Sequence, residues 1–303
     1  MKMKFKSTIR AAYHSFSGAV CAGAVMLIAS SAQAQNLFEA DFDSGTIYEF
    51  TPSGVKSAFA YGLYFPTGLA FDRAGDLFVG EINTFDIIKI TPGGVKSTFA
   101  SEVDSPWGMA FNSVGDLFVA NYVGNSITKI TPDGVQSTFA SGLSRPIGMA
   151  FDSAGNLFET DSGSGNIYEF TPGGVQSTFA SGLTGPGGLV FDSAGDLLVA
   201  FASGYIYKIT PGGVKSTFAT GLTNPQAMVF NSAGDLFVSI GTSDKITKIT
   251  AGGVKSTFAW GLSDPAGLAI QGETLPVPEP SALGLLAVGV TALLVRRRRN
   301  LAA

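Results

Sequence analysis

Four oxygen-bearing side chains recur at intervals of 40 residues in this chain: Asp41, Glu81, Asn121 and Asp161. Carboxylate and amide oxygens are the ligands that Ca²⁺ and Mg²⁺ prefer, and a pair of carboxylates can also serve as acid and base. If the fold gathers these positions, Glu81, Asn121 and Asp161 are candidate ligands of Ca²⁺ or Mg²⁺, and Asp41 is a candidate catalytic base. Alternatively, each side chain caps the loop that follows it by accepting backbone N–H groups.

Other catalytic chemistry is limited by what the chain lacks. Its only cysteine, Cys21, and its only histidine, His14, lie in an N-terminal leader that we expect to be removed. This excludes Cys-His and Ser-His-Asp nucleophilic systems, histidine-ligated metals and disulfides from the exported protein. Residues 35–275 contain 11 basic and 22 acidic residues. Such an acidic balance excludes nucleic acid as a partner.

The four side chains belong to a unit of about 40 residues that is repeated six times, with copies that start near residues 37, 77, 117, 157, 197 and 236. Each unit contains four short strands, which we name a to d; examples are residues 148–152, 117–120, 127–130 and 135–139. Their β-branched and aromatic residues, and turns such as Thr-Pro-Gly-Gly, favour strands over helices. Six units of four antiparallel strands predict an all-β fold, a six-bladed β-propeller.

The phase of the repeat predicts how the ring closes. The first copy begins at strand b, and the last copy ends with a strand a near residues 267–270, so this C-terminal strand should complete the N-terminal blade of strands b, c and d. We expect a signal peptide over residues 1–34, the propeller over 35–270, a linker over 271–277 and a sorting or transmembrane segment over 278–303. Ala32 and Ala34 form the A-x-A site that predicts cleavage after Ala34. Lipid attachment at Cys21 is the alternative, although its context is a poor lipobox.

Strand order also separates two faces of the ring. The a–b and c–d turns share one face, which we call the turn face, and the b–c and d–a loops share the other, the loop face. The turn face is nearly constant between copies, whereas the loop face carries almost all the differences. Aromatic rings beside carboxylates and amides suit sugar rings or lactones, although single aromatics can instead fill space between blades. The candidate ligand-binding residues of the loop face are Tyr64, Phe65, Thr67, Trp107, Tyr122, Ile147 and Gln226.

The repeated motif Pro-x-Gly-[LM]-Ala-Phe-Asp-x-x-Gly-[DN]-Leu-Phe-Val resembles that of NHL-repeat propellers and of their gluconolactonase and virginiamycin B lyase relatives. The resemblance covers all six units and implies a scaffold more than an activity. Gluconolactonase-like propellers hold a cation with Glu, Asn and Asp, which implies a Ca²⁺- or Mg²⁺-dependent lactone hydrolase as one alternative. The lyases rely on a histidine that residues 35–303 lack. We expect a binding or structural module for a carbohydrate or protein ligand, and a protein-protein interaction scaffold is a further alternative.

The C-terminal end has three parts: Pro278-Glu279-Pro280, the apolar stretch 281–295, and the basic cluster Arg296, Arg297, Arg298 and Arg299. As a helix, 15 residues span about 22 Å against a hydrocarbon core of about 30 Å, which is short for a permanent anchor. This arrangement resembles the PEP-CTERM sorting signal of Gram-negative bacteria.

The PEP-CTERM resemblance implies that the secretion machinery exports the chain, and that an exosortase-type enzyme then recognises the tail at an inner-membrane intermediate and removes it. The protein would then reach the cell envelope or the extracellular matrix, where an extracellular polysaccharide or an envelope protein would be its partner. A short hydrophobic helix outside the ring that stays as a single-span anchor is the alternative.

Overall fold

The structure is a computed structural model that describes residues 35–272. The predicted signal peptide and the predicted C-terminal hydrophobic helix therefore lie outside the described residues. Within residues 35–272, no helix is long and apolar enough to cross a membrane.

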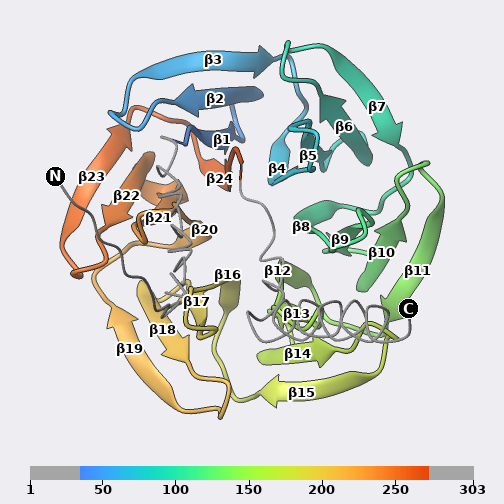
Figure 1. Cartoon of the computed structure of the whole chain (residues 1–303), viewed down its shortest axis with the longest axis vertical. Coiled ribbons are helices and arrows are strands. Elements are labelled where there is room, and N and C mark those ends of the chain that lie inside the picture. Colours follow the sequence, from blue (N-terminus) through green and yellow to red (C-terminus); the bar gives the residue numbers. More distant parts are fainter. Residues whose placement is uncertain (1–34, 273–303) are drawn as a thin grey trace, which may run out of the picture. The chain divides into compact units, whose positions relative to one another are not determined.

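The described chain forms six antiparallel sheets of four strands each, arranged as blades around a central axis (Figure 1). Blade 1 comprises β24 (Pro265–Ile270), β1 (Leu37–Asp41), β2 (Thr46–Phe50) and β3 (Lys56–Tyr61), and blade 2 comprises β4 (Pro66–Phe71), β5 (Leu77–Glu81), β6 (Asp86–Ile90) and β7 (Lys96–Ala100). Blade 3 comprises β8 (Pro106–Phe111), β9 (Leu117–Asn121), β10 (Ser126–Ile130) and β11 (Gln136–Ser141), and blade 4 comprises β12 (Pro146–Phe151), β13 (Leu157–Asp161), β14 (Asn166–Phe170) and β15 (Gln176–Ala180). Blade 5 comprises β16 (Pro186–Phe191), β17 (Leu197–Phe201), β18 (Tyr205–Ile209) and β19 (Lys215–Ala219). Blade 6 comprises β20 (Pro225–Phe230), β21 (Leu236–Ile240), β22 (Lys245–Ile249) and β23 (Lys255–Trp260), with the short 3-10 helix η1 (Gly241–Ser243) between β21 and β22. The predicted six-bladed propeller is confirmed.

The ring closes between the last strand and the first, as the repeat phase predicted. β24 pairs antiparallel with β1, with Ile270 opposite Leu37 and Leu268 opposite Glu39. The outermost strands meet at the same seam, where Lys56 Nζ of β3 donates to the carbonyl oxygen of Gly261, 3.1 Å away. The closure leaves no free inner edge between the first and last blades.

The core lies between neighbouring blades, because strand b is buried along its whole length and its side chains alternate between the two sides of the sheet. At the interface of blades 3 and 4, the Phe118 ring meets Phe139 and Phe151 edge to face, at centroid distances of 4.9 and 5.1 Å. Such T-shaped pairs stabilise a core beyond their buried area. Blades 1, 2 and 4 contribute equivalent phenylalanines, so one packing solution recurs around the ring.

The innermost strands approach each other closely, and glycine permits this. A Cβ atom on Gly108 of β8 would lie 2.0 Å from the carbonyl oxygen of Ile147 in β12, far inside van der Waals contact. Hydroxyl groups reinforce three alternate junctions. Thr67 Oγ1 donates to Pro106 O at 2.7 Å, Thr160 Oγ1 to Gly187 O at 2.5 Å, and Ser239 Oγ to Ala266 O at 2.9 Å.

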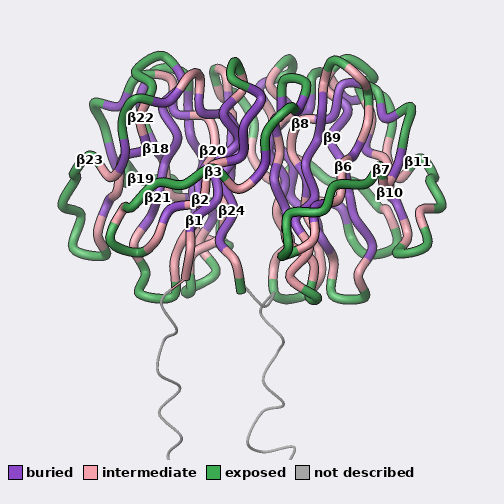
Figure 2. The backbone as a smooth tube through the Cα atoms, turned by 90° about the horizontal axis from the view of Figure 1, so that it is seen from above, coloured by how far each residue is buried: buried purple, intermediate pink, exposed green. Residues whose placement is uncertain are grey.

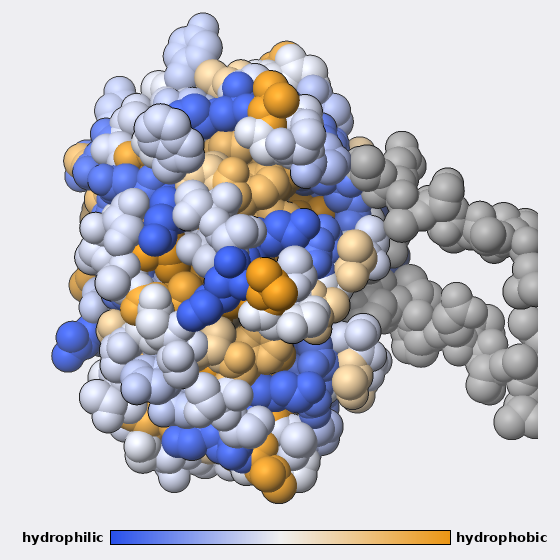
Figure 3. Space-filling view, turned by 90° about the vertical axis from the view of Figure 1, so that its left-hand side faces the viewer, coloured by the Kyte–Doolittle hydropathy of each residue, from blue (hydrophilic) through white to orange (hydrophobic). Residues whose placement is uncertain are grey.

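The outermost strands run head to tail around the ring and are joined by side chains at their first residues. Lys96 Nζ donates to Tyr61 O at 2.6 Å, and Gln136 Nε2 donates to Ser101 O at 2.8 Å, in each case reaching the preceding blade. Figure 3 shows the outer wall from one side, where single apolar residues alternate with hydrophilic ones. The wall seen there presents no continuous apolar patch.

Candidate functional site

The described chain begins and ends on the turn face. Gln271 N donates to Asn36 O at 3.1 Å, and Gln35 Oε1 accepts from the backbone of Ser232 in an a–b turn. Figure 2 shows both described ends on the same side of the ring. The loop face, which carries the differences between repeats, therefore lies opposite the point at which the sorting segment is attached.

The structure places the four predicted oxygen-bearing residues at the ends of β1, β5, β9 and β13, in four consecutive blades, and buries all of them. Asp41 accepts from the backbone of Ser44 at 3.2 Å and of Ser263 at 2.8 Å. Asp161 likewise accepts from the backbone of Ser164 at 2.9 Å and of Ser144 at 2.5 Å. Each carboxylate thus joins the b–c loop of its blade to the d–a loop that precedes the blade.

Glu81 and Asn121 vary this arrangement. Glu81 accepts from the Tyr64 backbone at 3.0 Å and from Thr84 Oγ1 at 2.8 Å. Asn121 donates through Nδ2 to the hydroxyls of Ser126 and Thr128, both at 2.8 Å, and its Oδ1 is buried without a partner. The contacts of Glu81 fit loop capping, whereas those of Asn121 do not, because it bonds two hydroxyls of β10 and accepts no loop N–H within the described chain.

Within residues 35–272, no three acidic side chains are grouped so that they could hold a metal ion. The oxygens of Glu81 and Asp161 are engaged by their own loops, and no contact in the described chain tests a centre that includes the Asn121 amide. The metal-ligand roles of Glu81, Asn121 and Asp161 and the catalytic role of Asp41 stay predictions.

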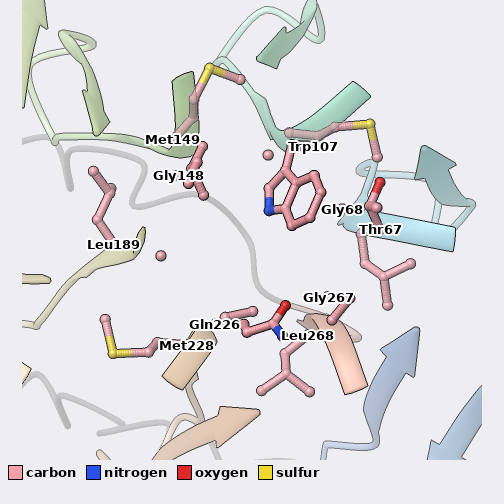
Figure 4. A pocket seen from close by; sticks show the side chains of 17 residues that line it. Thr67, Gly68, Trp107, Gly148, Met149, Leu189, Gln226, Met228, Gly267 and Leu268 are labelled. Carbon is pink, nitrogen blue, oxygen red and sulfur yellow. The ribbon is translucent and has the colours of Figure 1, made fainter. Parts of the chain in front are cut away.

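A cavity of about 100 Å³ lies on the axis, between the innermost strands. The predicted residues Thr67, Trp107, Ile147 and Gln226 all line it. Figure 4 shows the Trp107 indole and the Gln226 amide reaching into the open space, whereas Met149 and Leu189 turn away from its centre. The cavity thus offers one aromatic face, one amide and backbone groups, which are suitable contacts for a small polar ring.

Exposed aromatic rings lie around the axis on the loop face. Tyr64 is 59% exposed, Phe65 40% and Phe85 46%, which is unusual for aromatics that only fill a core. Phe65 lies beside Phe42 with ring centroids 5.0 Å apart, and Trp107 beside Tyr122 at 5.4 Å. We call these two pairs the aromatic platforms; Trp107 of one pair also lines the cavity, whereas Phe42 and Phe65 of the other do not.

The two faces differ in which residues have a left-handed backbone conformation. The sequence analysis did not predict this difference. Every non-glycine residue with a left-handed φ within residues 35–272 lies in a b–c or d–a loop. These residues are Phe65, Phe85, Glu102, Ser105, Asn125, Arg145, Asn224, Asp244 and Asp264. The turn face uses glycine at all its left-handed positions, such as Gly75 and Gly94. Comparison of the copies could have revealed it, because Phe85 stands where blades 1, 4 and 5 have Gly45, Gly165 and Gly204.

Charge is also unevenly distributed over the loop face. We call the loops of residues 241–244, 261–264, 42–45, 62–65, 82–85, 101–105 and 122–125 the acidic crescent; they are consecutive around blades 6, 1, 2 and 3. It contains Asp43, Glu102, Asp104, Asp244 and Asp264 and no lysine or arginine. The remaining loops of the face, 142–145, 162–165, 181–185, 202–204 and 220–224, contain Arg145 and no acidic residue. Burial and the nearby Asp43 carboxylate raise the pKa of Asp264, as expected where carboxylates gather.

Comparison with known proteins bears on the fold and on the tail. A chain in the crystal structure of a nidogen/laminin complex is similar to this one with a TM-score of 0.72 and 22% identity, over 78% of this chain and 98% of that chain. A selenomethionine-substituted virginiamycin B lyase from Staphylococcus aureus gives a TM-score of 0.61 and 20% identity, over 75% and 82% of the two chains. A putative gluconolactonase gives 0.59 and 16%, over 70% and 90%. At these identities, the similarity shows the fold alone.

No curated protein matches the sequence. The chain has the six-bladed β-propeller fold, and NHL- and gluconolactonase-like propellers are among its structural neighbours. Its own distinguishing feature is the match of residues 276–299 to the PEP-CTERM protein-sorting motif. The motif indicates recognition by exosortase-type sorting machinery and export through a membrane-anchored intermediate in Gram-negative bacteria.

Proposed function

We propose that this protein is a binding module of the cell envelope or extracellular matrix, and that its loop face contacts a carbohydrate. The observation that carries the proposal is the concentration of left-handed non-glycine residues on that face. A left-handed residue with a Cβ costs about 1 kcal/mol or more, and such strain accumulates at functional sites. Phe65 and Phe85 hold exposed rings at such positions although equivalent loops use glycine.

The position of the described ends supports this orientation. Because Asn36 and Gln271 meet on the turn face, a chain held through its sorting segment presents the loop face away from the point of attachment. The aromatic platforms and the cavity lined by Trp107 and Gln226 then face a partner in the surroundings. Aromatic rings beside amides are the usual contacts of sugar rings.

The test compares binding of the polysaccharide fraction from the producing bacterium by the parent protein and by a Phe65→Gly/Phe85→Gly variant. Both substitutions introduce residues that other blades carry at the same loop positions, Gly185 and Gly45 among them, so the fold should be kept. We expect about tenfold weaker binding, since loss of two stacked rings removes roughly 1 to 3 kcal/mol.

The control is Val135→Ala, which trims a side chain that is 64% exposed on the turn face. It should bind as the parent does. If the Phe65→Gly/Phe85→Gly variant binds as tightly as the parent while both melt at the same temperature, the loop face is not the binding surface.

The alternative lactone hydrolase has weaker support, because Asp41, Glu81 and Asp161 already accept hydrogen bonds from their own loops. It remains testable. The hydrolase is supported if Ca²⁺ or Mg²⁺ raises the melting temperature and if Glu81→Ala and Asp161→Ala each abolish the rise. The reason is that an ion bound only by the folded state must stabilise that state.

A further inference from the structure

The acidic crescent separates the loop face into two chemically different halves. Asp43, Glu102, Asp104 and Asp244 are exposed there, and no basic residue lies in the same loops. The turn face is different, because several of its carboxylates form ion pairs: Lys89 with Asp76 at 2.6 Å, for example, and Lys129 with Asp116 at 2.7 Å. Lys56 and Lys96 reach the crescent from the outer strands, at the carbonyl oxygens of Gly261 and Gly62, but within the described chain they form no ion pair with its carboxylates. A positively charged partner would relieve the repulsion between these carboxylates.

Three of the crescent's carboxylates occupy costly backbone positions. Glu102 has φ 62°, Asp244 φ 48° and Asp264 φ 54°. The position of Glu102 is glycine in every other blade, as in Gly62 and Gly142. A glycine would adopt the positive φ of each of these turns at a lower conformational cost. Asp244 also has a structural role, because its Oδ1 accepts from the Asp264 backbone at 3.2 Å. Glu102 has no side-chain hydrogen bond within the described chain, so the fold alone does not favour its charge at this position.

Exposed aromatic rings lie among these carboxylates. Tyr64, Phe65 and Phe85 belong to the loops of the crescent, whereas the loops of the opposite half contain no aromatic residue. An ammonium group is attracted both by a carboxylate and by the face of an aromatic ring. A sugar ring stacks on the same aromatic face through its C–H groups.

On the basis of the proposed binding function, we infer that the ligand of the acidic crescent is a cationic polysaccharide, a glucosamine-type polymer whose amino groups are free and protonated. The exposed carboxylates lie in blade 6, in blade 1 and in the connection between blades 2 and 3, rather than in one pocket, which matches a repeating charge along a chain better than a single ion. The apolar side chains exposed in the crescent are Tyr64, Phe65, Phe85 and Val123, and only Tyr64 and Phe65 of these are neighbours in sequence. A stable protein interface needs a contiguous buried centre, so this surface fits a glycan better than a basic protein.

The experiment uses the full chain, purified in mild detergent, and measures its affinity for glucosamine oligosaccharides with free amino groups. Fully N-acetylated oligosaccharides of the same length provide the neutral probe, and polylysine provides the cationic peptide probe. We expect the free-amine oligosaccharides to bind at least about tenfold more tightly than the N-acetylated ones at low salt, with most of the difference lost between about 0.05 and 0.5 M salt as the charges are screened.

Variants separate charge from shape. Glu102→Gln/Asp244→Asn removes two charges and keeps the side-chain size, and Glu102→Gly/Asp244→Gly introduces the residue that other blades use at these turns. Both should bind the free-amine oligosaccharides roughly tenfold more weakly. Glu102→Gln/Asp244→Asn should melt no lower than the parent, because an asparagine can still accept from the Asp264 backbone, as Asn125 does from Arg145. The control is Asp133→Ser on the turn face, where blade 1 has Ser53 at the same turn position; it removes one negative charge and should leave affinity unchanged.

Three results would overturn the inference: equal affinity for free-amine and N-acetylated oligosaccharides, tighter binding of polylysine than of either, or an equal loss of affinity in Asp133→Ser. The proposed binding function is judged separately, by the polysaccharide fraction of the producing bacterium. If that fraction binds through Phe65 and Phe85 while the free-amine probe does not bind, only the cationic ligand is wrong. If neither binds, both proposals fail.

Discussion

At the scale of single residues, Glu159 is the least expected side chain in the core. It lies in the middle of β13, fully buried, and its carboxyl oxygens have no hydrogen-bond partner within the described chain. Burial, with a smaller contribution from Asp161, raises the pKa of Glu159 to about 9, so the group is neutral at pH 7. Glu39 in β1 is also a buried carboxyl. Burial, with a smaller contribution from the Asp41 carboxylate, raises the pKa of Glu39 well above its ordinary value. The other blades have valine here: Val79, Val119, Val199 and Val238.

These two carboxyls predict a loss of stability at alkaline pH. Between pH 4.5 and about 9, the unfolded chain has released the Glu159 proton while the folded chain still holds it. The free energy of unfolding should therefore fall as pH rises through this window, by roughly 1.4 kcal/mol per pH unit for each such group. Residues 35–272 contain no histidine or cysteine that would titrate there.

The check is denaturant unfolding at a series of pH values for the parent and for Glu159→Val, with Glu39→Val/Glu159→Val as the second variant. Glu159→Val should be more stable at pH 8 and show a shallower slope, and the double variant should be nearly flat. A parent whose stability does not change between pH 5 and 9 would show that these carboxyls are not buried as described.

Phe85 allows a prediction on strain. Phe85→Gly removes an exposed ring but relieves a φ of 61°. The two effects on the free energy of unfolding should cancel to within about 1 kcal/mol. In the same blade, Phe78 is 3% exposed, and Phe78→Ala should cost about 3 to 5 kcal/mol. Comparable losses in thermal melts of the two variants would mean that Phe85 has a packing role rather than a ligand-binding one.

At the scale of elements, the approach of neighbouring innermost strands determines the width of the axis. Gly108→Ala would force β8 away from the Ile147 carbonyl of β12, and overpacking of this kind costs about 1 to 3 kcal/mol. Gly187→Ala is the matched control, because its nearest contact would be 3.6 Å away. A melting temperature lowered by Gly108→Ala alone is the expected result, and equal behaviour of the two variants would contradict the close packing.

The strands themselves could be predicted from sequence, because each unit repeats the same apolar and turn residues with the period of a four-stranded blade. The same reasoning placed Trp107 and Gln226 at the axis, since both follow the proline that begins an innermost strand. It could not choose between a catalytic base and a loop cap for Asp41, or between a metal ligand and a loop cap for Glu81, because that depends on which backbone N–H groups the d–a loops bring near. The left-handed φ at Glu102 was accessible from sequence, because the other copies have glycine there, whereas the lack of a partner for the buried carboxyl of Glu159 is a consequence of the assembled ring.

At the scale of the whole molecule, the chain combines a ring that closes on itself with a sorting motif at residues 276–299. Removal of the tail by an exosortase-type enzyme is a prediction that mass spectrometry can check. The protein recovered from the envelope or matrix of the producing bacterium should lack Arg296, Arg297, Arg298 and Arg299. Retention of these arginines would favour the single-span anchor.

The central claim is that the loop face, and not the turn face, contacts the ligand. Hydrogen-deuterium exchange of the protein with and without the polysaccharide fraction of the producing bacterium tests it most directly. We predict slower exchange in residues 62–65, 82–85 and 101–105, with no change in the Thr-Pro-Gly-Gly turns that contain Gly94 and Gly174. Protection confined to those turns, or spread equally over both faces, would contradict the account.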